Sequence, residues 1–320
     1  MQSILAVTVP FFALVLAGYL AAHRHVLPES AIPGLNTFVL YFALPAMLFR
    51  FGAGTPILQL FDPVVLGVYL ASALLIVFFT VAITWREPVG LKDAAFGALV
   101  AAFPNTGFMG VPLLVALLGP AAAGPVISVV LADLFVTSSI CIALAQAGDA
   151  VGHGARAGAV RALRGALANP LPWAIALGAL FSVGGWSLPG PVDTVVRMLA
   201  DAATPVALFT IGAVLHRGGQ HAHTRTPPSR YLPVAAVKLF VHPLLVFALA
   251  STAVRLGLPL STFQATAITL AAALPSASNV SLLAERYGAD NGRIARIIMS
   301  STAAAFVSFS LLAWGFGARP

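Results

Sequence analysis

The feature that most constrains this chain is a succession of long apolar stretches that leaves little room for anything else. Each is about as long as the ~20 residues that a helix needs to cross a bilayer. Apolar residues make up 59% of the 320 positions and charged residues only 8%, far outside the range of soluble domains. The sequence therefore predicts an all-α integral membrane protein with ten spans, at residues 3–22, 34–51, 63–84, 94–118, 122–146, 170–188, 195–215, 231–254, 262–286 and 293–316.

Two prolines, Pro104 and Pro275, interrupt the middle of the fourth and ninth stretches. Proline removes a backbone donor and clashes with the preceding turn, so we expect both helices to break there, with a further break at Pro112. Inside a bilayer, a break is tolerated only in protein or beside a water-filled cavity. Paired breaks in the two halves of a chain point to the substrate site of a secondary transporter. We therefore expect the fourth and ninth helices to cross at such a site.

The two halves of the chain repeat short patterns at similar spacings. Ala43–Phe49 and Ala203–Phe209 both read A-x-P-x-x-L-F and lie 160 residues apart, and the runs that precede the two central prolines lie 171 residues apart. Five spans per unit is an odd number, so the second unit must be inverted relative to the first, an arrangement typical of transporters. The sequence thus predicts a 5+5 inverted repeat, with units at 1–165 and 166–320.

Basic residues fall mainly into alternate loops. Twelve follow the odd-numbered spans and four lie on the opposite side, which by the positive-inside rule places the first set in the cytoplasm. We expect a multi-pass protein of the bacterial inner membrane with both termini outside. The first set is Arg24, Arg86, Lys92, Arg156, Arg161, Arg164, Arg217, Arg225, Arg230, Arg286, Arg293 and Arg296, and the second is Arg50, Arg197, Arg255 and Arg319.

Polar and small residues follow both central prolines. A helix that restarts after a break offers free N–H groups and the positive end of its dipole to an anion, whereas unwound carbonyls favour a cation. The lack of a fixed negative group beside the breaks favours an anion. The alternative is a pair of proline kinks whose backbone groups are satisfied by neighbouring helices. We predict that substrate is bound by Asn105, Thr106, Gly107, Ser276, Ser278 and Asn279.

Asp133 stands near the middle of the fifth span. An ionisable group at that depth costs ~2.5–3.5 kcal/mol on insertion scales and is a functional candidate by default. It is a candidate proton carrier or Na⁺ ligand, together with Thr137 one turn further on; the alternative is a protonated aspartate that hydrogen-bonds across a helix interface. Lys238 in the eighth span either snorkels to the surface, pairs with Asp133 or attracts an anionic substrate. H⁺ or Na⁺ as coupling ion is the sole cofactor that we expect.

Several other functions find no support in the sequence. The absence of a Gly-Lys-Ser/Thr nucleotide loop leaves an ion or substrate gradient as the energy source. The basic residues have no interleaved aromatic residues, so we expect no nucleic-acid partner. A lone cysteine, Cys141, provides neither a disulfide framework nor a thiol metal site. Without a paired catalytic set in the helices or an output domain, an enzyme or a receptor is only a remote alternative.

The run Asn105–Leu114 resembles the helix 4 motif of the auxin efflux carrier family. That family includes plant auxin exporters and bacterial members labelled malonate or malate transporters. Further matches keep their order along the chain: Leu35–Asn36, Tyr41–Pro45, Asn169–Pro170, Ala203–Pro205, Lys238–Leu239, His242–Pro243 and Leu274–Gly288.

The resemblance implies a ten-helix fold related to bile-acid sodium symporters and sodium/proton antiporters. It implies a scaffold at about 1–55 and 166–217, through which two copies would form a homodimer, and a transport domain at about 60–148 and 230–318. We interpret the chain as a secondary active or facilitative transporter of small organic anions, chiefly carboxylates, that works by an elevator-type mechanism. The alternative is a cation/proton antiporter centred on Asp133, although such proteins usually use more than one acidic group in the membrane.

Overall fold

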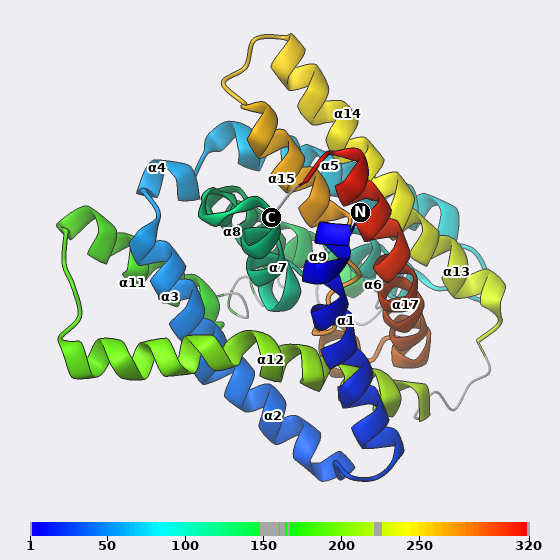
Figure 1. Cartoon of the computed structure of the whole chain (residues 1–320). Coiled ribbons are helices and arrows are strands. Elements are labelled where there is room, and N and C mark those ends of the chain that lie inside the picture. The colour runs from blue at the N-terminus through cyan, green and yellow to red at the C-terminus, as the bar shows by residue number, and fades with distance from the viewer. Residues whose placement is uncertain (1, 148–159, 161–163, 165–166, 221–225, 319–320) are drawn as a thin grey trace.

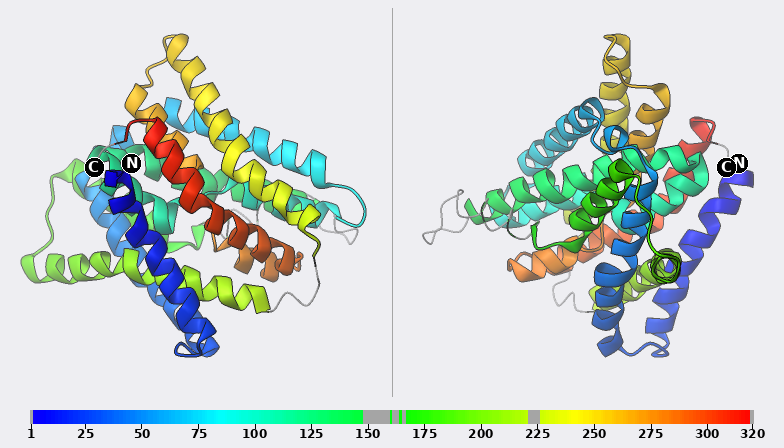
Figure 2. Two further views of the ribbon diagram at one scale, coloured as in Figure 1. Left: turned by 45° about the vertical axis from the view of Figure 1, so that its right-hand side comes forward. Right: turned by 90° about the vertical axis from the view of Figure 1, so that its left-hand side faces the viewer.

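The computed structural model describes residues 2–147, 160, 164, 167–220 and 226–318, and these residues form helices without any β-strand (Figure 1). The predicted all-α fold is therefore confirmed for this part of the chain. The expected repeat boundary at 165 and 166 lies outside it, as do Arg156, Arg161, Arg225 and Arg319. The N-terminal end of α1 lies beside the C-terminal end of α17 in all views (Figures 1 and 2).

The helices of the first half follow the apolar stretches. Two short 3₁₀ turns, η1 and η4, lead into longer helices, and π-helical turns η2, η3 and η5 lie within them. In chain order the elements are α1 (Gln2–His23), η1 (Glu29–Ala31), α2 (Ile32–Phe38), η2 (Val39–Ala43), α3 (Leu44–Gly54), α4 (Ile57–Leu60), α5 (Pro63–Thr84), α6 (Leu91–Ala102), η3 (Thr106–Gly110), α7 (Val111–Leu118), η4 (Pro120–Ala122), α8 (Ala123–Ala132), η5 (Asp133–Thr137) and α9 (Ser138–Ala147).

The second half has the same character, with one further π-helical turn, η6. Its elements are α11 (Pro170–Gly184), α12 (Gly190–Gln220), α13 (Pro228–Ala236), η6 (Val237–Val241), α14 (His242–Arg255), α15 (Thr262–Ala272), α16 (Val280–Arg286) and α17 (Asn291–Gly315).

Seven continuous helical segments in the described residues are long and apolar enough to cross a membrane. The predicted sixth span is shorter, because α11 has 15 residues and a length of about 22 Å. The predicted fourth and ninth spans are each divided into two short helices. Large apolar side chains lie exposed on the outer surface, including Trp173, Phe240 and Trp314, as a lipid-facing surface requires. The seven segments are Gln2–His23, Glu29–Gly54, Ile57–Thr84, Pro120–Ala147, Gly190–Arg217, Pro228–Arg255 and Asn291–Gly315.

Both central prolines lie in interruptions of the helix. α6 ends two residues before Pro104, and η3 begins two residues after it. α15 ends three residues before Pro275, and α16 begins five residues after it. Between these helices the two interruptions pair with each other in an isolated antiparallel bridge that joins Pro104 and Ser276.

The break expected at Pro112 is wrong. Thr106–Leu118 is one continuous helix, and Pro112 lies in the first turn of α7, two residues after the π-helical turn η3. Pro45 and Pro243 follow η2 and η6 at the same spacing. A π-helical turn shifts the hydrogen-bond register where proline cannot donate, so the helix continues past the proline.

Glycines bring α1 and α12 into close contact. Gly18 on α1 faces the backbone carbonyl of Phe209 on α12, and Gly212 on α12 faces the carbonyl of Val15 on α1. A Cβ at either glycine would overlap that carbonyl, so the two backbones approach only because both residues lack one. Small residues at helix crossings permit this packing, which is common in membranes.

The same contact recurs between α11 and α3, shifted by 160 positions. Gly178 on α11 faces the carbonyl of Phe49 on α3, and Gly52 on α3 faces the carbonyl of Ile175 on α11. All four residues lie 160 positions from their counterparts in the α1–α12 contact, which is also the spacing of the A-x-P-x-x-L-F pattern. The similarity between the two halves therefore extends from sequence to packing.

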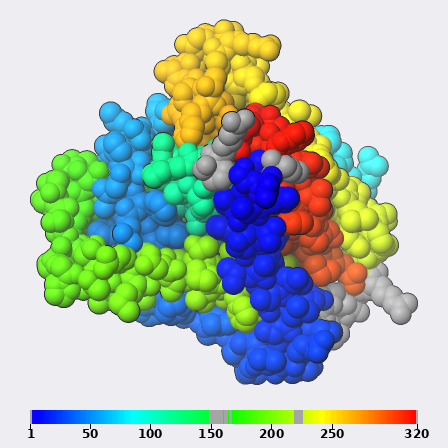
Figure 3. All heavy atoms as spheres, in the orientation of Figure 1, coloured from blue at the N-terminus to red at the C-terminus, as the bar shows by residue number. Residues whose placement is uncertain are grey.

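The helices fall into two sets by their packing. α1, α3, α11 and α12 pack on one another, whereas α5 to α9 pack with α13 to α17. The sets meet where α1 contacts α7 and α17 and where α12 contacts α17 and η3. On the face shown in Figure 3, α1 (blue) runs between α12 (green) and α17 (red).

Candidate functional site

The two interrupted helices meet through their backbones. The Asn105 N–H donates to the Pro275 carbonyl at 2.8 Å, and the Ala277 N–H donates to the Phe103 carbonyl at 3.0 Å. Each break thereby supplies the partners that the other lacks, which satisfies backbone groups that lipid could not. The crossing is a fixed structural unit in which the ends of four short helices converge.

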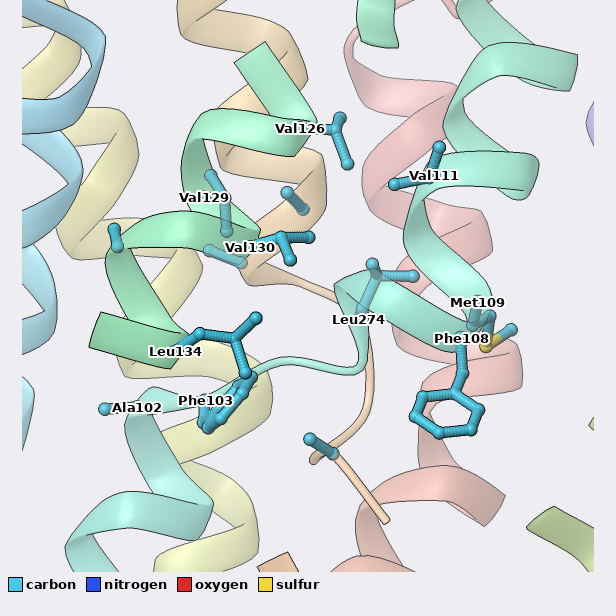
Figure 4. Packing of buried hydrophobic residues seen from close by; sticks show 14 of the residues in the cluster. Ala102, Phe103, Phe108, Met109, Val111, Val126, Val129, Val130, Leu134 and Leu274 are labelled. Atoms are coloured by element: carbon cyan, nitrogen blue, oxygen red, sulfur yellow. The ribbon is translucent and has the colours of Figure 1, made fainter. Parts of the chain in front are cut away.

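The crossing is packed in apolar side chains. Phe103 and Leu274 from the two breaks belong to one buried cluster with Phe108 and Met109 of η3 and with the valines of α8 (Figure 4). Leu274 also lies against Gly110, because a Cβ at Gly110 would be 2.6 Å from the Leu274 Cδ1 atom. This packing excludes water from one side of the crossing.

The structure brings together the polar residues that the sequence assigned to substrate. Asn105, Thr106, Ser276 and Ser278 are buried, and Asn279 is half-buried. The amide oxygens of Asn105 and Asn279 and the hydroxyl of Ser276 have no hydrogen-bond partner among the described residues. A buried polar atom left unpaired costs about 1–3 kcal/mol, so each such atom calls for an explanation, for example a ligand or a water molecule.

Gly107 differs from its neighbours because it borders open space. A Cβ placed at Gly107 would meet no described atom within 4 Å. The N–H groups of Gly107 and Phe108 also take no part in the backbone hydrogen bonds of the crossing. The first turn of the Thr106–Leu118 helix thus presents donors and positive dipole potential beside an unfilled volume.

A cavity of about 670 Å³ reaches the crossing from one side. The crossing contributes Phe103, Phe108 and Asn279 to its wall, whereas Asn105 and Ser276 do not line it. The opposite wall belongs to the other set of helices. Residues from that set are Pro33, Asn36, Thr37, Leu40, Tyr41, Asn169, Val214 and Arg217, and the remaining wall includes Glu285, Arg286, Tyr287 and Asn291.

Asp133 is completely buried behind the crossing, at the start of η5. The Tyr69 hydroxyl donates to its Oδ2 atom at 2.8 Å, and the Thr137 hydroxyl donates to its Oδ1 atom at 3.0 Å. The predicted contact with Thr137 is therefore present. Tyr69 is a further partner, and it comes from α5.

Lys238 is also completely buried, which excludes the expectation that it snorkels to the surface. Its Nζ atom donates to the Ala272 carbonyl and lies 3.4 Å from the Nδ1 atom of His242. No salt bridge within 4 Å joins Lys238 to Asp133 in the described residues, but the two groups are close enough to interact electrostatically. The His242 ring and the Tyr69 ring, 5.9 Å apart, connect the two residues into one polar cluster.

This cluster supplies a hydrogen-bond donor to the C-terminal ends of α6 and α15, the two helices that end at the crossing. The last residue of α15 is Ala272, whose carbonyl accepts from Lys238. The last residue of α6 is Ala102, whose carbonyl lies 3.4 Å from the Tyr69 hydroxyl. A helix C-terminus carries partial negative charge, which these donors offset. The N-terminal turn of Thr106–Leu118 keeps its positive potential, because no such group offsets it among the described residues.

Sequence reasoning missed Tyr69 and the wall residue Phe103. Tyr69 and Lys238 are 169 positions apart, the spacing that also relates Gly119 to Gly288, so the repeat itself would have indicated Tyr69. Phe103 carried no such signal, because apolar residues beside a proline are common in membrane helices.

Comparisons with known proteins agree with the membrane assignment and extend it. A family model described as a membrane transport protein matches residues 3–313. The chain is 27% identical over 304 residues to a protein of Rhizobium meliloti (strain 1021) named "Putative malonate transporter", covering 94% of this chain and 92% of the relative. It is 25% identical over 301 residues to an uncharacterized transporter of Methanothermobacter thermautotrophicus, covering 93% of both. Auxin efflux carrier component 8 of Arabidopsis thaliana is 22% identical over 259 residues, covering 65% of this chain and 71% of the relative.

Proposed function

The chain belongs to the membrane transport protein family that includes the auxin efflux carriers, and from this premise we propose that it carries small organic anions, chiefly carboxylates, across the cytoplasmic membrane. It is a multi-pass membrane transporter and not an enzyme, as the family and its named members are. The name of the Rhizobium relative supports a carboxylate as substrate.

The electrostatics of the crossing carry the proposal of an anion. Donors from Tyr69 and Lys238 face the carbonyl ends of α6 and α15, at Ala102 and Ala272. The N-terminal turn of Thr106–Leu118 faces open space with unused amide groups. A carboxylate bound there would accept from backbone N–H groups at a helix N-terminus, which is a common anion-binding arrangement.

Repeated contacts support a 5+5 inverted repeat of ten helices. The α1–α12 and α11–α3 contacts are equivalent at a spacing of 160 residues, and Tyr69 and Lys238 are equivalent at 169. The interruptions of the fourth and ninth helices occupy equivalent positions at the crossing, where they pair with each other. Two similar halves of opposite orientation can exchange conformations, which is the basis of alternating access.

Polar contacts at both ends of the second helix set support its movement as one body. At one end, the buried Arg293 side chain of α17 donates from Nε to the Arg230 carbonyl at 3.0 Å and from Nη1 to the Asp93 carbonyl at 2.9 Å. At the other end, the Gln264 amide donates to Asp62 Oδ2 at 2.9 Å. We propose that this set (about 60–148 and 230–318) is the moving transport domain, and that the set with α1, α3, α11 and α12 (about 1–55 and 166–217) is the scaffold.

The position of the cavity supports an inward-open state. Asn36 near the start of the second helix, Asn169 before α11, Arg217 near the end of α12 and Arg286 at the end of α16 all line it. In the topology proposed from the positive-inside rule, these four helix ends face the cytoplasm. The cavity would then connect the crossing to the cytoplasm, with both termini on the outer side.

A binding screen on purified protein tests the proposal. Monocarboxylates and dicarboxylates are added with and without Na⁺ and across pH, and thermal unfolding is recorded. A ligand at 100 times its dissociation constant stabilises by ~2.7 kcal/mol, so carboxylates should raise the unfolding temperature. Stabilisation by cationic or neutral solutes alone would contradict the proposal. Na⁺-driven proton movement in proteoliposomes without any organic solute would instead support an antiporter centred on Asp133.

A further inference from the structure

We propose that the two helix sets turn about one backbone torsion at Pro56, so that α4 moves with the transport domain while Thr55 stays with the scaffold. The inference rests on the proposed movement of the two sets and specifies where the chain between them bends. α4 (Ile57–Leu60) connects α3 of the scaffold to α5 of the transport domain.

The chain as far as Thr55 is held by the scaffold. Thr55 directly follows α3 and is buried, and its carbonyl accepts from the Ser182 hydroxyl of α11 at 3.3 Å. The close glycine contact between α3 and α11 lies just before this point. Because the carbonyl is fixed to α11, the planar peptide between Thr55 and Pro56 keeps its orientation relative to the scaffold.

The chain from Gln59 onward is held by the transport domain. The Ser128 hydroxyl of α8 donates to the Leu60 carbonyl at 2.7 Å, and Leu60 is completely buried. Gly124, one turn earlier on α8, lies against the Gln59 carbonyl, since a Cβ at this glycine would be 2.7 Å from the carbonyl oxygen. Asp62 then caps α5 and accepts from α15. α4 also contacts α11 of the scaffold, but no hydrogen bond joins these two helices in the described part of the chain.

Proline chemistry leaves one free rotation between these two regions. The Pro56 ring fixes its φ, which is −57°, and restricts Thr55 to the extended conformation that it adopts, with φ −119° and ψ 130°. The Pro56 carbonyl accepts from the N–H groups of Gln59 and Leu60, so it turns together with α4. The remaining torsion is ψ of Pro56, which is 136°.

Rotation about this torsion leaves the neighbouring structure intact. The first N–H groups of a helix have no acceptor within it, so turning α4 as a body breaks none of its own hydrogen bonds. Leu58 is 83% exposed, so the outer side of α4 is not packed against described residues. Hinges are commonly a few residues at the ends of elements that absorb such a change in torsion. A single axis then guides the transport domain along one path between its two states.

Distances between pairs of spin labels test this inference on the full-length protein in proteoliposomes, with and without malonate, in a Cys141→Ala background. The label sites are exposed residues of the scaffold, α4 and the transport domain, introduced in pairs as Val183→Cys, Leu58→Cys and Leu256→Cys. The pair at 183 and 256 reports movement between the sets and should show two distances. The pair at 58 and 183 should change with it, whereas the pair at 58 and 256 should keep one distance.

A second measurement tests the torsion itself. Pro56→Gly frees φ and gives α4 a second axis, so the distances between labels at 58 and 183 should broaden and uptake should fall several-fold. Pro189→Gly is the matched control. Pro189 also precedes a helix, and its carbonyl accepts from the Asp193 N–H in α12, but it connects two helices of the scaffold. Both variants gain the same entropy in the unfolded state, so only a hinge predicts a difference between them.

The outcomes separate the hinge from the proposed function. A constant distance between labels at 58 and 183, while both pairs that include 256 change, places the bend after α4 and overturns the hinge, although the movement stands. A single distance between 183 and 256 in transport-active protein contradicts the movement and the hinge together. If two distances occur in proportions that malonate does not alter, malonate is contradicted as a substrate and the hinge stands. Should Pro56→Gly fail to fold, the label pairs in the protein with Pro56 still decide the question.

Discussion

At the scale of single residues, the crossing depends on which side chains leave room and which fill it. Gly107 and Gly110 lie in the same π-helical turn, yet one borders open space and the other contacts Leu274. In the sequence both glycines simply follow Pro104 at short distance. Only the three-dimensional structure distinguishes a glycine that leaves space for a ligand from one that leaves space for a neighbouring side chain.

We expect Gly107→Ala to lower uptake at least tenfold without loss of stability. Its methyl group meets no described atom within 4 Å, and alanine is favoured over glycine in helices by up to about 1 kcal/mol. The methyl would instead occupy the space in front of the unused amide groups. Gly110→Ala is the contrast: it forces Leu274 to move and should cost about 1–3 kcal/mol of unfolding free energy. Thermal unfolding and proteoliposome uptake measure the two effects, and normal uptake by Gly107→Ala would exclude substrate from this space.

Asn105→Ala and Asn279→Ala should each reduce uptake at least tenfold while the protein still folds. A buried polar substrate that loses one hydrogen-bond partner loses about 1–3 kcal/mol. Asn279 lines the cavity, whereas Asn105 is buried and does not line it, so we expect the Asn279 variant to show the larger rise in the substrate dissociation constant. Thr252→Ala, at an exposed position on α14 outside the cavity, is the control. Near-normal transport by both crossing variants would remove the crossing as the binding site.

At the scale of elements, local sequence predicts where a helix ends better than what stabilises that end. The breaks at Pro104 and Pro275 followed from proline chemistry next to polar residues. Pro112 did not break its helix, since a π-helical turn accommodated it, and nothing in the local pattern distinguishes the two outcomes. The hydrogen-bond donors that face the ends of α6 and α15 come from other helices. The sequence of α6 or α15 alone therefore could not predict them.

Tyr69→Phe should destabilise the protein by about 1–3 kcal/mol, because it removes one donor to the buried Asp133 and leaves the Ala102 carbonyl without its hydroxyl. The ring and its packing are retained, so the loss reports on the hydroxyl alone. Unfolding in detergent, followed by near-ultraviolet circular dichroism, measures it. Tyr41→Phe, on the exposed cavity wall, should leave stability unchanged. Equal stability of both variants and wild type would show that the Tyr69 hydroxyl is dispensable.

Gly18→Ala should prevent α1 from packing on α12. A Cβ at this position overlaps the Phe209 carbonyl, which belongs to the backbone and cannot turn aside. We expect a large loss of monodisperse protein in size-exclusion chromatography, a loss that the equivalent Gly178→Ala should reproduce. Gly67→Ala on α5, where no described atom lies within 4 Å of the new Cβ, should behave as wild type. A well-folded Gly18→Ala would mean that the close contact is not required.

At the scale of the whole molecule, the sequence predicted the membrane class and the family because both depend on features spread over the entire chain. The length of the apolar stretches and the order of the family motifs can be recognised even when each predicted helix end is wrong by a few residues. The number of spans is harder, because a helix such as α11 is short for a bilayer and the fourth and ninth are broken. The packing of the helices on one another depends on contacts between positions that are distant in the sequence, such as Gly18 with Phe209. A pattern within one apolar stretch does not indicate such contacts.

The last prediction tests whether the two helix sets move relative to each other during transport. Tyr41 on η2 and Leu282 on α16 face the same cavity from opposite sets, so a link between them should stop an elevator-type movement. The sequence contains one cysteine, the buried Cys141, so Cys141→Ala gives a background without thiols. In that background, Tyr41→Cys with Leu282→Cys, joined by a flexible and cleavable bis-maleimide, should abolish uptake, and cleavage of the linker should restore it. Phe247→Cys with Phe316→Cys lies within one set, where the native rings are 5.3 Å apart, and its cross-link should leave uptake unchanged. Continued transport by the cross-linked Tyr41 and Leu282 variant would mean that substrate crosses without relative movement of the two sets.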